Sequence, residues 1–429
     1  MHRQIQTVAV LGASGTVGSL SGGILAQNGL NVYYLSRTRE GSQKGLSRAI
    51  KQARSEAIAA RIICGDYNTL FEKACSEADW ILECVAEDMA VKKAMYEKVD
   101  AVRRKDSIVS SVTSSLPLEE LPQGRSDSFQ ANFLSTHFYN PPGKMLACEV
   151  TGQSQTDPAL VDFMIEFLGR RLRRVVIPVK PTAAFAGNRL AFLLFARITD
   201  LVQQFGVEMM DYLIGPYTGR LLPPLATIDL VGLDIHKAIL LSLQTYTQDA
   251  MHNKLVIPAY IDTMIAAGRL GNKTRTSGGF FKKLDSGQYL YYDPASEDYI
   301  PGYGPRIQFV EKAKNQIHIG LYRQAFEGIL QASGTEARVV QEILATYIAY
   351  AYSLIGQVTD EKYGIEGIDK VMSSGFHWAC PSLLVNMMGG TQKAVELVQS
   401  ADLAVPLALR TDTTWKKYYF NAGKYFIAG

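Results

Sequence analysis

His137 and Glu149 are two residues whose types and spacing suit acid–base chemistry. They lie 12 positions apart (149 − 137), with the turn-forming residues Pro141, Pro142 and Gly143 between them. An antiparallel hairpin that turns there would place the imidazole and the carboxylate opposite each other on two strands. A carboxylate at one ring nitrogen fixes the tautomer and stabilises the imidazolium, so the other nitrogen can take a hydroxyl proton. The alternative is a buried histidine with a satisfied partner and no part in chemistry.

A glycine-rich turn near the N-terminus predicts a dinucleotide site. The apolar run 7–11 is typical of a buried parallel strand, and the helix-like stretch 19–27 follows the turn. Glycines in such a turn let the backbone approach a pyrophosphate, and the helix N-terminus adds unpaired N–H groups and partial positive charge. The residues of the turn that we expect to contact the cofactor are Gly12, Gly15, Thr16, Val17 and Gly18.

The end of the second predicted strand, 29–35, departs from the usual dinucleotide pattern. An Asp or Glu normally binds the ribose 2′-hydroxyl there, but this chain has Ser36 followed by Arg37. Ser36 cannot supply a negative charge, whereas Arg37 and Arg39 could meet a 2′-phosphate or could simply be solvated. The glycine spacing is also one residue longer than the common pattern. We expect Ser36 and Arg37 to lie at the cofactor ribose, and these residues leave both NAD and NADP open.

Composition and charge exclude several classes of protein. The chain has 429 residues, 47% apolar and 20% charged, which is ordinary for a globular protein of two or three domains. The net charge of +3 favours neither nucleic acid nor a membrane surface as a partner. The five cysteines show no metal-ligand spacing, so we expect reduced thiols and no metal. Without a recognisable signal peptide or membrane span, we expect a cytoplasmic protein.

Alternating strand and helix patterns continue after the glycine turn and predict an α/β Rossmann-type domain. Apolar runs predict further strands at 79–85, 106–111, 133–139 and 175–179, and an amphipathic pattern predicts a helix over 89–102. The polar loop 112–115 follows one of these strands, where ligands bind in open α/β sheets. From Asn188 onward the apolar residues recur at helical spacing, which predicts an all-α C-terminal region with two related helical domains.

The chain resembles the L-3-hydroxyacyl-CoA dehydrogenase family in motifs that follow the family's order. They are Thr-Ser-Ser-Leu at 113–116, His-Phe-Tyr-Asn-Pro at 137–141, Ala-Gly-Asn-Arg-Leu at 186–190, Asp-Leu-Val-Gly-Leu-Asp at 229–234 and Gly-Arg-Leu-Gly-Asn-Lys at 268–273. The segment around His137 is especially similar to the dehydrogenase part of multifunctional fatty-acid oxidation proteins. The resemblance covers essentially the whole chain. It implies NAD(P)-dependent oxidation of L-3-hydroxyacyl-CoA to 3-ketoacyl-CoA, and the reverse reduction.

The resemblance also implies roles for individual residues. His137 matches the family's catalytic base, and Glu149 matches the carboxylate that orients it. Ser114 matches a serine that contacts the substrate hydroxyl and the nicotinamide region, and Asn188 matches an asparagine near the substrate carbonyl. Asn140 is a further residue that we expect to contact the substrate, an acyl-CoA.

Positions expected at the cofactor are partly matched. Glu87 and Lys92 match cofactor-contacting positions of the family. Two family residues are missing, because an amide position is Val112 and the ribose-binding acid is Ser36. Neither change touches the acid–base pair. The resemblance favours NAD(H), with NADP(H) as the alternative that the Ser36–Arg37 pair leaves open.

The helical half contains an internal similarity. The segment Pro-Leu-Ala-Thr-Ile-Asp-Leu-Val-Gly at 224–232 parallels Pro-Ser-Leu-Leu-Val-Asn-Met-Met-Gly at 381–389, a spacing of 157 positions (381 − 224). At that spacing Asn188 falls on Ala345, so the second copy lacks the amide. We expect the second copy to pack like the partner subunit of a simpler dimer, which gives a monomer or homodimer with one active site per chain. The alternative is chance similarity between two helical segments.

Four segments are therefore expected. Residues 1–180 form a dinucleotide-binding domain, 181–285 a first helical domain, 286–330 a connecting segment and 331–429 a second, degenerate helical domain. Two other functions stay open. One is an oxidoreductase of the same superfamily that acts on a hydroxy acid without CoA. The other is a catalytically dead nucleotide-binding regulatory protein, which the altered ribose site would suit.

Overall fold

The chain forms two compact units, residues 1–185 and 186–429, which we call the sheet unit and the helical unit. The computed structural model describes residues 3–274 and 276–413. The division between the units falls close to the predicted boundary at residue 180. The further divisions predicted at 285 and 330 stay predictions, and residues 414–429 of the predicted last domain lie outside the described residues.

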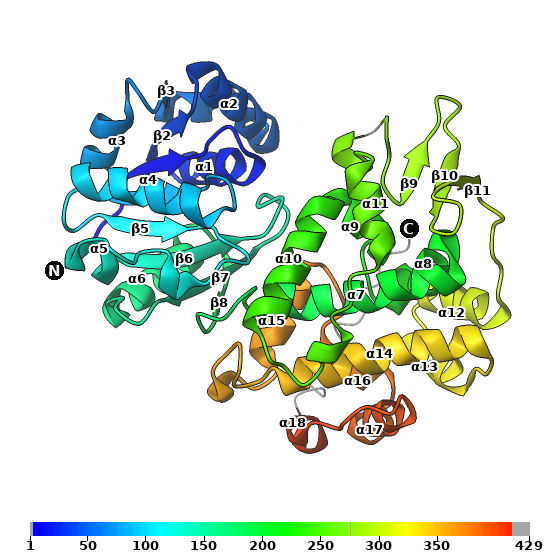
Figure 1. The fold of residues 1–429 in the computed structure, drawn as a ribbon. Coiled ribbons are helices and arrows are strands. Elements are labelled where there is room, and N and C mark those ends of the chain that lie inside the picture. The colour runs from blue at the N-terminus through cyan, green and yellow to red at the C-terminus, as the bar shows by residue number, and fades with distance from the viewer. Residues whose placement is uncertain (1–2, 275, 414–429) are drawn as a thin grey trace. The chain divides into compact units, whose positions relative to one another are not determined.

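An eight-stranded sheet, in the order β3-β2-β1-β4-β5-β6-β7-β8, is the middle layer of the sheet unit (Figure 1). The strands from β3 to β6 are parallel, β6 pairs with β7 antiparallel, and β7 pairs with β8 parallel. The strands are β1 (Thr7–Leu11), β2 (Asn31–Ser36), β3 (Ile62–Asp66), β4 (Trp80–Glu83), β5 (Ile108–Ser111), β6 (Phe133–Phe138), β7 (Ala147–Gly152) and β8 (Val175–Pro178). The predicted Rossmann-type α/β fold is confirmed.

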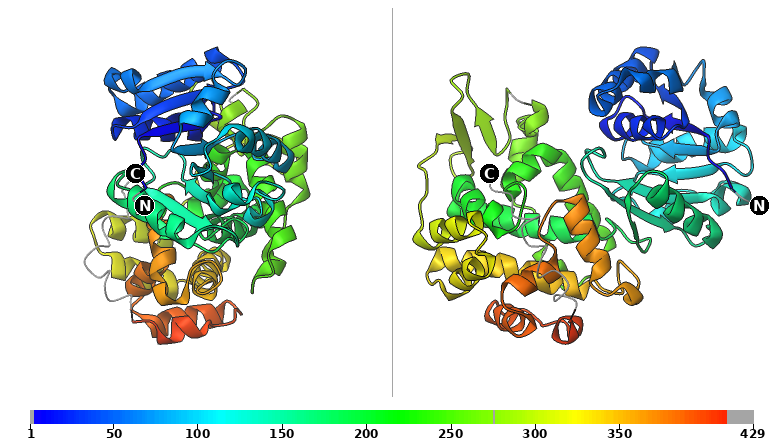
Figure 2. Two further views of the ribbon diagram at one scale, coloured as in Figure 1. Left: turned by 90° about the vertical axis from the view of Figure 1, so that its left-hand side faces the viewer. Right: turned by 180° about the vertical axis from the view of Figure 1, so that it is seen from behind.

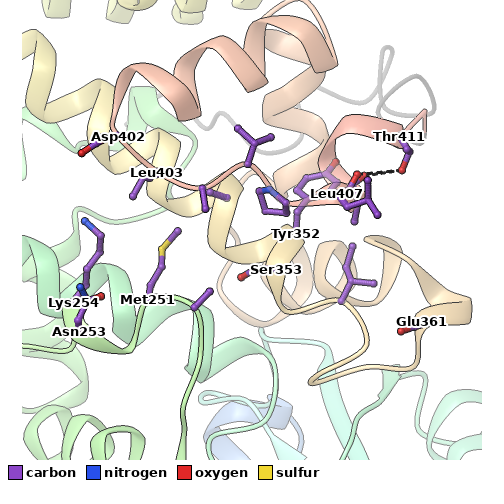
Figure 3. A pocket seen from close by; sticks show the side chains of 17 residues that line it. Met251, Asn253, Lys254, Tyr352, Ser353, Glu361, Asp402, Leu403, Leu407 and Thr411 are labelled. Carbon is purple, nitrogen blue, oxygen red and sulfur yellow. Dashed lines mark hydrogen bonds between the residues drawn. The ribbon is translucent and has the colours of Figure 1, made fainter.

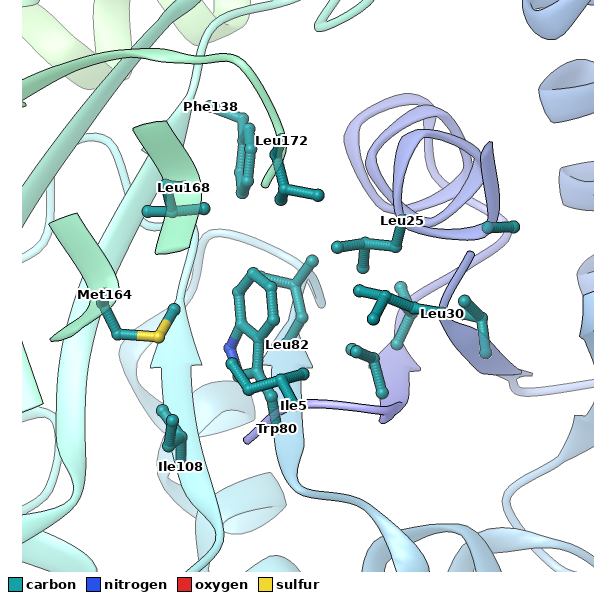
Figure 4. Close-up of a cluster of buried hydrophobic side chains, with 14 of the residues drawn as sticks. Ile5, Leu25, Leu30, Trp80, Leu82, Ile108, Phe138, Met164, Leu168 and Leu172 are labelled. Atoms are coloured by element: carbon teal, nitrogen blue, oxygen red, sulfur yellow. The ribbon is translucent and has the colours of Figure 1, made fainter. Parts of the chain in front are cut away.

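Helices cover both faces of this sheet (Figure 2). The reason is the alternation of side chains along buried strands, since Trp80 and Leu82 of β4 pack on one face and Ile81 on the other. Each face therefore has its own hydrophobic core, and Figure 4 shows Trp80 and Leu82 in one of them. One face carries α1 (Thr16–Gln27), α2 (Arg39–Ala53) and α6 (Pro158–Arg170); the other carries α3 (Phe71–Glu77), α4 (Met89–Val102) and α5 (Asp127–Ala131). Short 3-10 helices are η1 (Glu56–Arg61) and η2 (Leu118–Glu120).

Strand β3 was not predicted from the sequence. Its five residues, Ile62–Asp66, lie at the edge of the sheet, where Ile63 is 54% exposed. An edge strand needs no continuous apolar run, so the pattern that marks buried parallel strands is weak there.

The helical unit is built around two long helices, α7 (Gly187–Phe205) and α14 (Thr335–Ser353), that pack side by side (Figure 1). The shorter helices are α8 (Val207–Leu213), α9 (Pro224–Val231), α10 (Leu233–Tyr246), α11 (Ala259–Ala266), α12 (Gln308–His318), α13 (Tyr322–Gln331), α15 (Glu366–Gly375), α16 (Pro381–Met387), α17 (Thr391–Ser400) and α18 (Leu407–Thr411). The 3-10 helices are η3 (Pro216–Thr218), η4 (His252–Lys254), η5 (Asn272–Thr274) and η6 (Glu361–Tyr363). The predicted helical character is confirmed, and the region also carries a small antiparallel sheet of β9 (Phe281–Lys283), β10 (Tyr289–Asp293) and β11 (Asp298–Pro301).

The helical unit has a first half that contains α7, α8 and α9 and a second half that contains α14, α15 and α16, and both halves use a carboxylate to cap a helix. Asp211 of α8 accepts hydrogen bonds from the backbone N–H groups of Leu225 (2.8 Å) and Ala226 (3.0 Å) at the start of α9. Asp369 of α15 accepts one from the N–H of Ser382 (3.2 Å) at the start of α16. In each half a buried carboxylate of one helix therefore caps the next helix, which supports the proposed duplication.

The spacing of 157 positions holds for α9 and α16 but not for the long helices. Helices α7 and α14 each have 19 residues, and their first residues are 148 positions apart (335 − 187). By position within the helix, Asn188 corresponds to Glu336 rather than to Ala345. The connecting segments thus differ in length between the two halves.

Among the described residues, no helix is both long enough and apolar enough to cross a membrane.

Gly45→Ala tests the packing of α2 on the glycine turn. A Cβ at Gly45 would lie 2.1 Å from the backbone oxygen of Ala13, so α2 would have to shift and the melting temperature should fall. Gly169→Ala, in α6, is the matched control because its Cβ would meet only Val176, at 3.9 Å. Alanine is preferred to glycine inside a helix by about 1 kcal/mol, so this control should be as stable as the wild type or more so. Thermal denaturation measures both; a stable Gly45→Ala protein would contradict the close approach.

Candidate active site

The carboxyl ends of the parallel strands meet at one edge of the sheet, where ligands bind in open α/β folds. Gly12 follows β1, Ser36 ends β2, Glu83 ends β4, and Ser111 ends β5. His137 is the next-to-last residue of β6. The sheet therefore brings the predicted glycine turn, ribose position, serine loop and histidine to a common edge. Asn188 belongs to the helical unit, where it is the second residue of α7 and 8% exposed.

His137 and Glu149 face each other across the β6–β7 hairpin, as the sequence predicts. They are direct partners in the strand register, and His137 Nδ1 lies 2.7 Å from Glu149 Oε2. Glu149 is fully buried and His137 is 6% exposed. The carboxylate fixes the orientation of the ring and leaves Nε2 as the nitrogen for proton exchange.

Tyr139 and Phe185 complete the surroundings of the imidazole. The Tyr139 hydroxyl donates to Glu149 Oε2 at 2.9 Å. The centroid of the His137 ring lies 4.8 Å from that of Tyr139 and 5.7 Å from that of Phe185. Burial, followed by the charge of Glu149, raises the pKa of Tyr139 well above its usual value, so its hydroxyl remains a donor. Tyr139 was not predicted, although its position two residues after His137 places both side chains on one face.

The glycine turn fits a pyrophosphate. Gly12 has φ of +87°, and a Cβ there would lie 2.3 Å from the backbone oxygen of Cys84. Gly15 is the N-cap residue of α1 and has no side chain that could cap the helix. The backbone N–H groups of Thr16, Val17 and Gly18 form the first turn, where an anion is stabilised by the helix dipole. These residues could hold the phosphates of a dinucleotide.

The predicted ribose position at the end of β2 has no acidic side chain. Ser36 is 2% exposed, and its hydroxyl donates to the backbone oxygen of Thr38 at 2.6 Å. Arg37, the next residue, is exposed. On the adjacent strand β3, Asp66 is the register partner of Ser36, but its Oδ1 accepts hydrogen bonds from the N–H groups of Asn68 and Thr69, both 2.9 Å. These hydrogen bonds, that of Thr69 first, hold the pKa of Asp66 below its usual value.

A buried charge network joins β4 to α4. Lys92 is fully buried, and its Nζ lies 2.8 Å from Glu83 Oε1 and 3.4 Å from Glu87 Oε2. Glu83, also fully buried, accepts further hydrogen bonds from Ser111 Oγ (2.8 Å) and from the Tyr96 hydroxyl. Burial lowers the pKa of Lys92, but the two carboxylates outweigh it and the net pKa is raised. Glu83 was not predicted; an acid within the otherwise apolar predicted strand 79–85 is the signal that could have found it.

Glu87 connects this network to the serine loop. Its Oε1 accepts hydrogen bonds from Thr113 Oγ1 (2.7 Å) and from the backbone N–H groups of Ser114 (2.8 Å) and Ser115 (3.0 Å). Burial raises the pKa of Glu87, but the charge of Lys92 and these donors bring it below its usual value. The Glu87 side chain is 31% exposed, whereas Lys92 is wholly covered. The network therefore fixes the loop that carries Ser114.

The side chains of the predicted substrate residues differ in exposure. Ser114 is half-buried, and its Oγ is 3.5 Å from Glu87 Oε1, a weak contact that leaves the hydroxyl able to donate elsewhere. Asn140 is exposed just after β6. In the described residues, His, Cys, Asp and Glu form no group of three that could hold a metal ion.

A pocket of about 760 Å³ lies in the helical unit (Figure 3). Its walls come from the segment 250–254, the C-terminal part of α14 and the segment 402–411. The predicted acid–base pair belongs to the sheet unit, so the pocket is a separate feature.

Comparison with protein families gives two adjoining matches. Residues 7–182 match the NAD binding domain of 3-hydroxyacyl-CoA dehydrogenase, and residues 185–282 match the C-terminal domain of that family. The first match contains the glycine turn and the His137–Glu149 pair, and the second begins just before α7.

Individual relatives agree with these matches. A probable 3-hydroxyacyl-CoA dehydrogenase of Bacillus subtilis is 30% identical over 93% of this chain and 53% of its own length. A probable 3-hydroxyacyl-CoA dehydrogenase of Deinococcus radiodurans is 31% identical over 65% of this chain and 83% of its own length. The chain thus spans about half of the Bacillus relative. The crystal structure of 3-hydroxybutyryl-CoA dehydrogenase from Escherichia coli covers 98% of this chain and 100% of that one, with a TM-score of 0.66 and 18% identity, which shows a common fold.

Lys92→Met should destabilise the sheet unit strongly. The change leaves the carboxylates of Glu83 and Glu87 without their buried cation, and breaking a buried ion pair on one side costs about 3–5 kcal/mol. Lys98→Met, an exposed position on the same helix, is the control and should change stability by less than about 0.5 kcal/mol. Denaturant unfolding gives both values. Equal stabilities of the two variants would show that the network does not hold this unit together.

Proposed function

The chain belongs to the 3-hydroxyacyl-CoA dehydrogenase family, and we propose that it interconverts L-3-hydroxyacyl-CoA and 3-ketoacyl-CoA with a nicotinamide cofactor. The observation that carries this proposal is the 2.7 Å contact between His137 Nδ1 and Glu149 at the carboxyl edge of the sheet. The same edge bears a glycine turn suited to a dinucleotide. A buried histidine with a purely structural role would not need this location.

His137 is the proposed general acid and base. Oxidation of a secondary alcohol removes a hydride from carbon and a proton from oxygen, and hydride transfer is the chemistry that a bound nicotinamide supplies. Nε2 of His137 takes the hydroxyl proton, while Glu149 at Nδ1 stabilises the imidazolium. In the reduction the imidazolium returns this proton to the ketone oxygen. Tyr139 donates to the same carboxylate oxygen and helps to hold it in place.

Three further residues are proposed to position the substrate. Ser114, on the loop that Glu87 holds, donates to the reacting oxygen. Asn188, in the first turn of α7, binds the carbonyl of the thioester, and Asn140 contacts the substrate from the end of β6. Together these contacts would fix the carbinol carbon for hydride transfer.

The remaining proposals concern partners and location. We propose an acyl-CoA substrate, no nucleic-acid or membrane partner, and a cytoplasmic location. The second half of the helical unit, packed along α7 through α14, is proposed to replace the partner subunit of a simpler dimer, which leaves a monomer or a homodimer with one active site per chain.

For the cofactor, the matched family domain binds NAD, and we propose that the ribose end also admits NADP(H). Residues at the ends of β2 and β3 support this proposal. Ser36 brings no charge to the end of β2, the carboxylate of Asp66 is engaged by its own turn, and Arg37 is exposed beside them. An arginine next to the ribose can accommodate a 2′-phosphate.

His137→Gln tests the proposed base. Turnover of acetoacetyl-CoA with NADH should fall by about 10²–10⁴-fold, the usual contribution of a positioned general acid, while the dissociation constant of NADH stays unchanged. His318→Gln, at an exposed histidine, should keep full turnover. Turnover within a few fold of the wild type would remove His137 from the mechanism. Free acetoacetate is assayed beside acetoacetyl-CoA. Faster turnover of the free acid would favour the alternative function, an oxidoreductase that acts on a hydroxy acid without CoA.

Arg37→Ala tests the proposed phosphate contact. Loss of one guanidinium from a phosphate should lower kcat/KM for NADPH by about tenfold, in line with the strength of a charge-assisted hydrogen bond, and leave that for NADH within twofold. Lys44→Ala, an exposed cation on α2, is the control and should leave both values unchanged. An equal effect of Arg37→Ala on both cofactors would argue against a 2′-phosphate at this position.

A further inference from the structure

The residue that follows Asn188 is held by a buried network within the helical unit. Arg189 donates from Nε and Nη2 to the two carboxylate oxygens of Asp249, a bidentate pair. The hydroxyl of Tyr350 donates to Asp249 Oδ2. The exposed fractions of these residues are 6% for Arg189, 8% for Asp249 and 1% for Tyr350.

The three residues come from different parts of the helical unit. Arg189 lies in the first turn of α7, and Asp249 lies between α10 and η4. Tyr350 lies near the C-terminal end of α14, the long helix of the second half. The second half therefore contributes a side chain to a network that ends one residue from Asn188.

The backbone that leads into the first turn of α7 has an unusual conformation. Its N-cap residue is Ala186, whose methyl group cannot accept a hydrogen bond from the turn. The chain enters the helix through Ala184 and Phe185, which have φ of +59° and +48°, values that cost free energy for residues with a side chain. The turn that carries Asn188 is therefore strained at its entry, and the interactions of Arg189 contribute to fixing it.

The charges in the network favour one arrangement. Burial lowers the pKa of Arg189, but the hydrogen bond and charge of Asp249 outweigh it, and the net pKa is raised. Burial and then the charge of Asp249 raise the pKa of Tyr350 well above its usual value, so this hydroxyl remains a donor. A bidentate guanidinium–carboxylate pair has a fixed plane, and the Tyr350 hydroxyl holds the carboxylate within it.

We propose that Tyr350 is a positioning residue for Asn188, acting through Asp249 and Arg189. The proposal rests on the proposed function, in which Asn188 binds the thioester carbonyl. It gives the second half of the helical unit a part in catalysis beyond covering α7. The reactive geometry of Asn188 then depends on a residue 162 positions away in the chain (350 − 188).

Helix α14 offers matched control residues. The hydroxyl of Tyr352 donates to Asp412, and that of Tyr347 donates to the backbone oxygen of Ala379 at 3.0 Å. Both rings are buried, 2% exposed for Tyr352 and 1% for Tyr347. Tyr352 lines the pocket of Figure 3. Removal of either hydroxyl costs a buried hydrogen bond on the same helix without changing the network at Arg189.

The test compares Tyr350→Phe with Tyr352→Phe and Tyr347→Phe in the full chain. Tyr350→Phe keeps the Arg189–Asp249 ion pair, so the protein should fold with a melting temperature similar to those of the controls. We expect kcat/KM for acetoacetyl-CoA to fall about tenfold in Tyr350→Phe alone, with an unchanged dissociation constant for NADH and an unchanged pH profile. The two controls should stay within twofold of the wild type.

Hydrogen exchange provides a second measurement, which does not depend on enzymatic activity. Backbone hydrogen exchange of residues 186–192 should be at least fivefold faster in Tyr350→Phe than in the wild type and unchanged in both controls. If the wild type has no activity with acyl-CoA, the proposed function fails, and the exchange rates still decide whether Tyr350 orders the first turn of α7. Unchanged exchange in Tyr350→Phe, or equal losses of kcat/KM in all three variants, would overturn the proposal.

Discussion

The burial of one lysine between two carboxylates is the interaction on which the proposed active site depends. Charges in a low-dielectric interior persist only when each is matched and hydrogen-bonded, so Glu83 and Lys92 leave little freedom to the elements that carry them. Through Glu87 this order reaches the serine loop. The charge network of the sheet unit thus holds the serine loop in place, next to the proposed cofactor site.

The proposed catalytic side chains are held in place by different interactions in the two units. In the sheet unit, adjacent strands place His137 and Glu149 in direct register, so backbone hydrogen bonds determine the distance between the side chains. In the helical unit, Asn188 lies in a helix turn that follows two residues of positive φ, and a side-chain network through Arg189 supplies the order. Strand register tolerates many substitutions, whereas a three-residue network depends on each member.

The sequence predicted best what depends on short-range periodicity. The hairpin follows from turn residues midway between His137 and Glu149, and the glycine turn follows from a strand and a helix close in sequence. Glu83 was missed because the predicted strand 79–85 shows an acid among apolar residues, but the pattern does not show that this acid is buried against Lys92. Asp66 was missed because β3 is an exposed edge strand. The contact between Asp249 and Tyr350 spans 101 positions, and a single sequence holds no signal that joins them.

The antiparallel pairing of β6 and β7 has a consequence for how the protein folds. Neighbouring parallel strands need a long crossover before they can pair, but β6 and β7 are joined directly by the loop 139–146. Contacts of low sequence separation cost little loop-closure entropy. The residues proposed for proton transfer thus belong to a local folding unit, and they can meet before the long-range pairings of the sheet are complete.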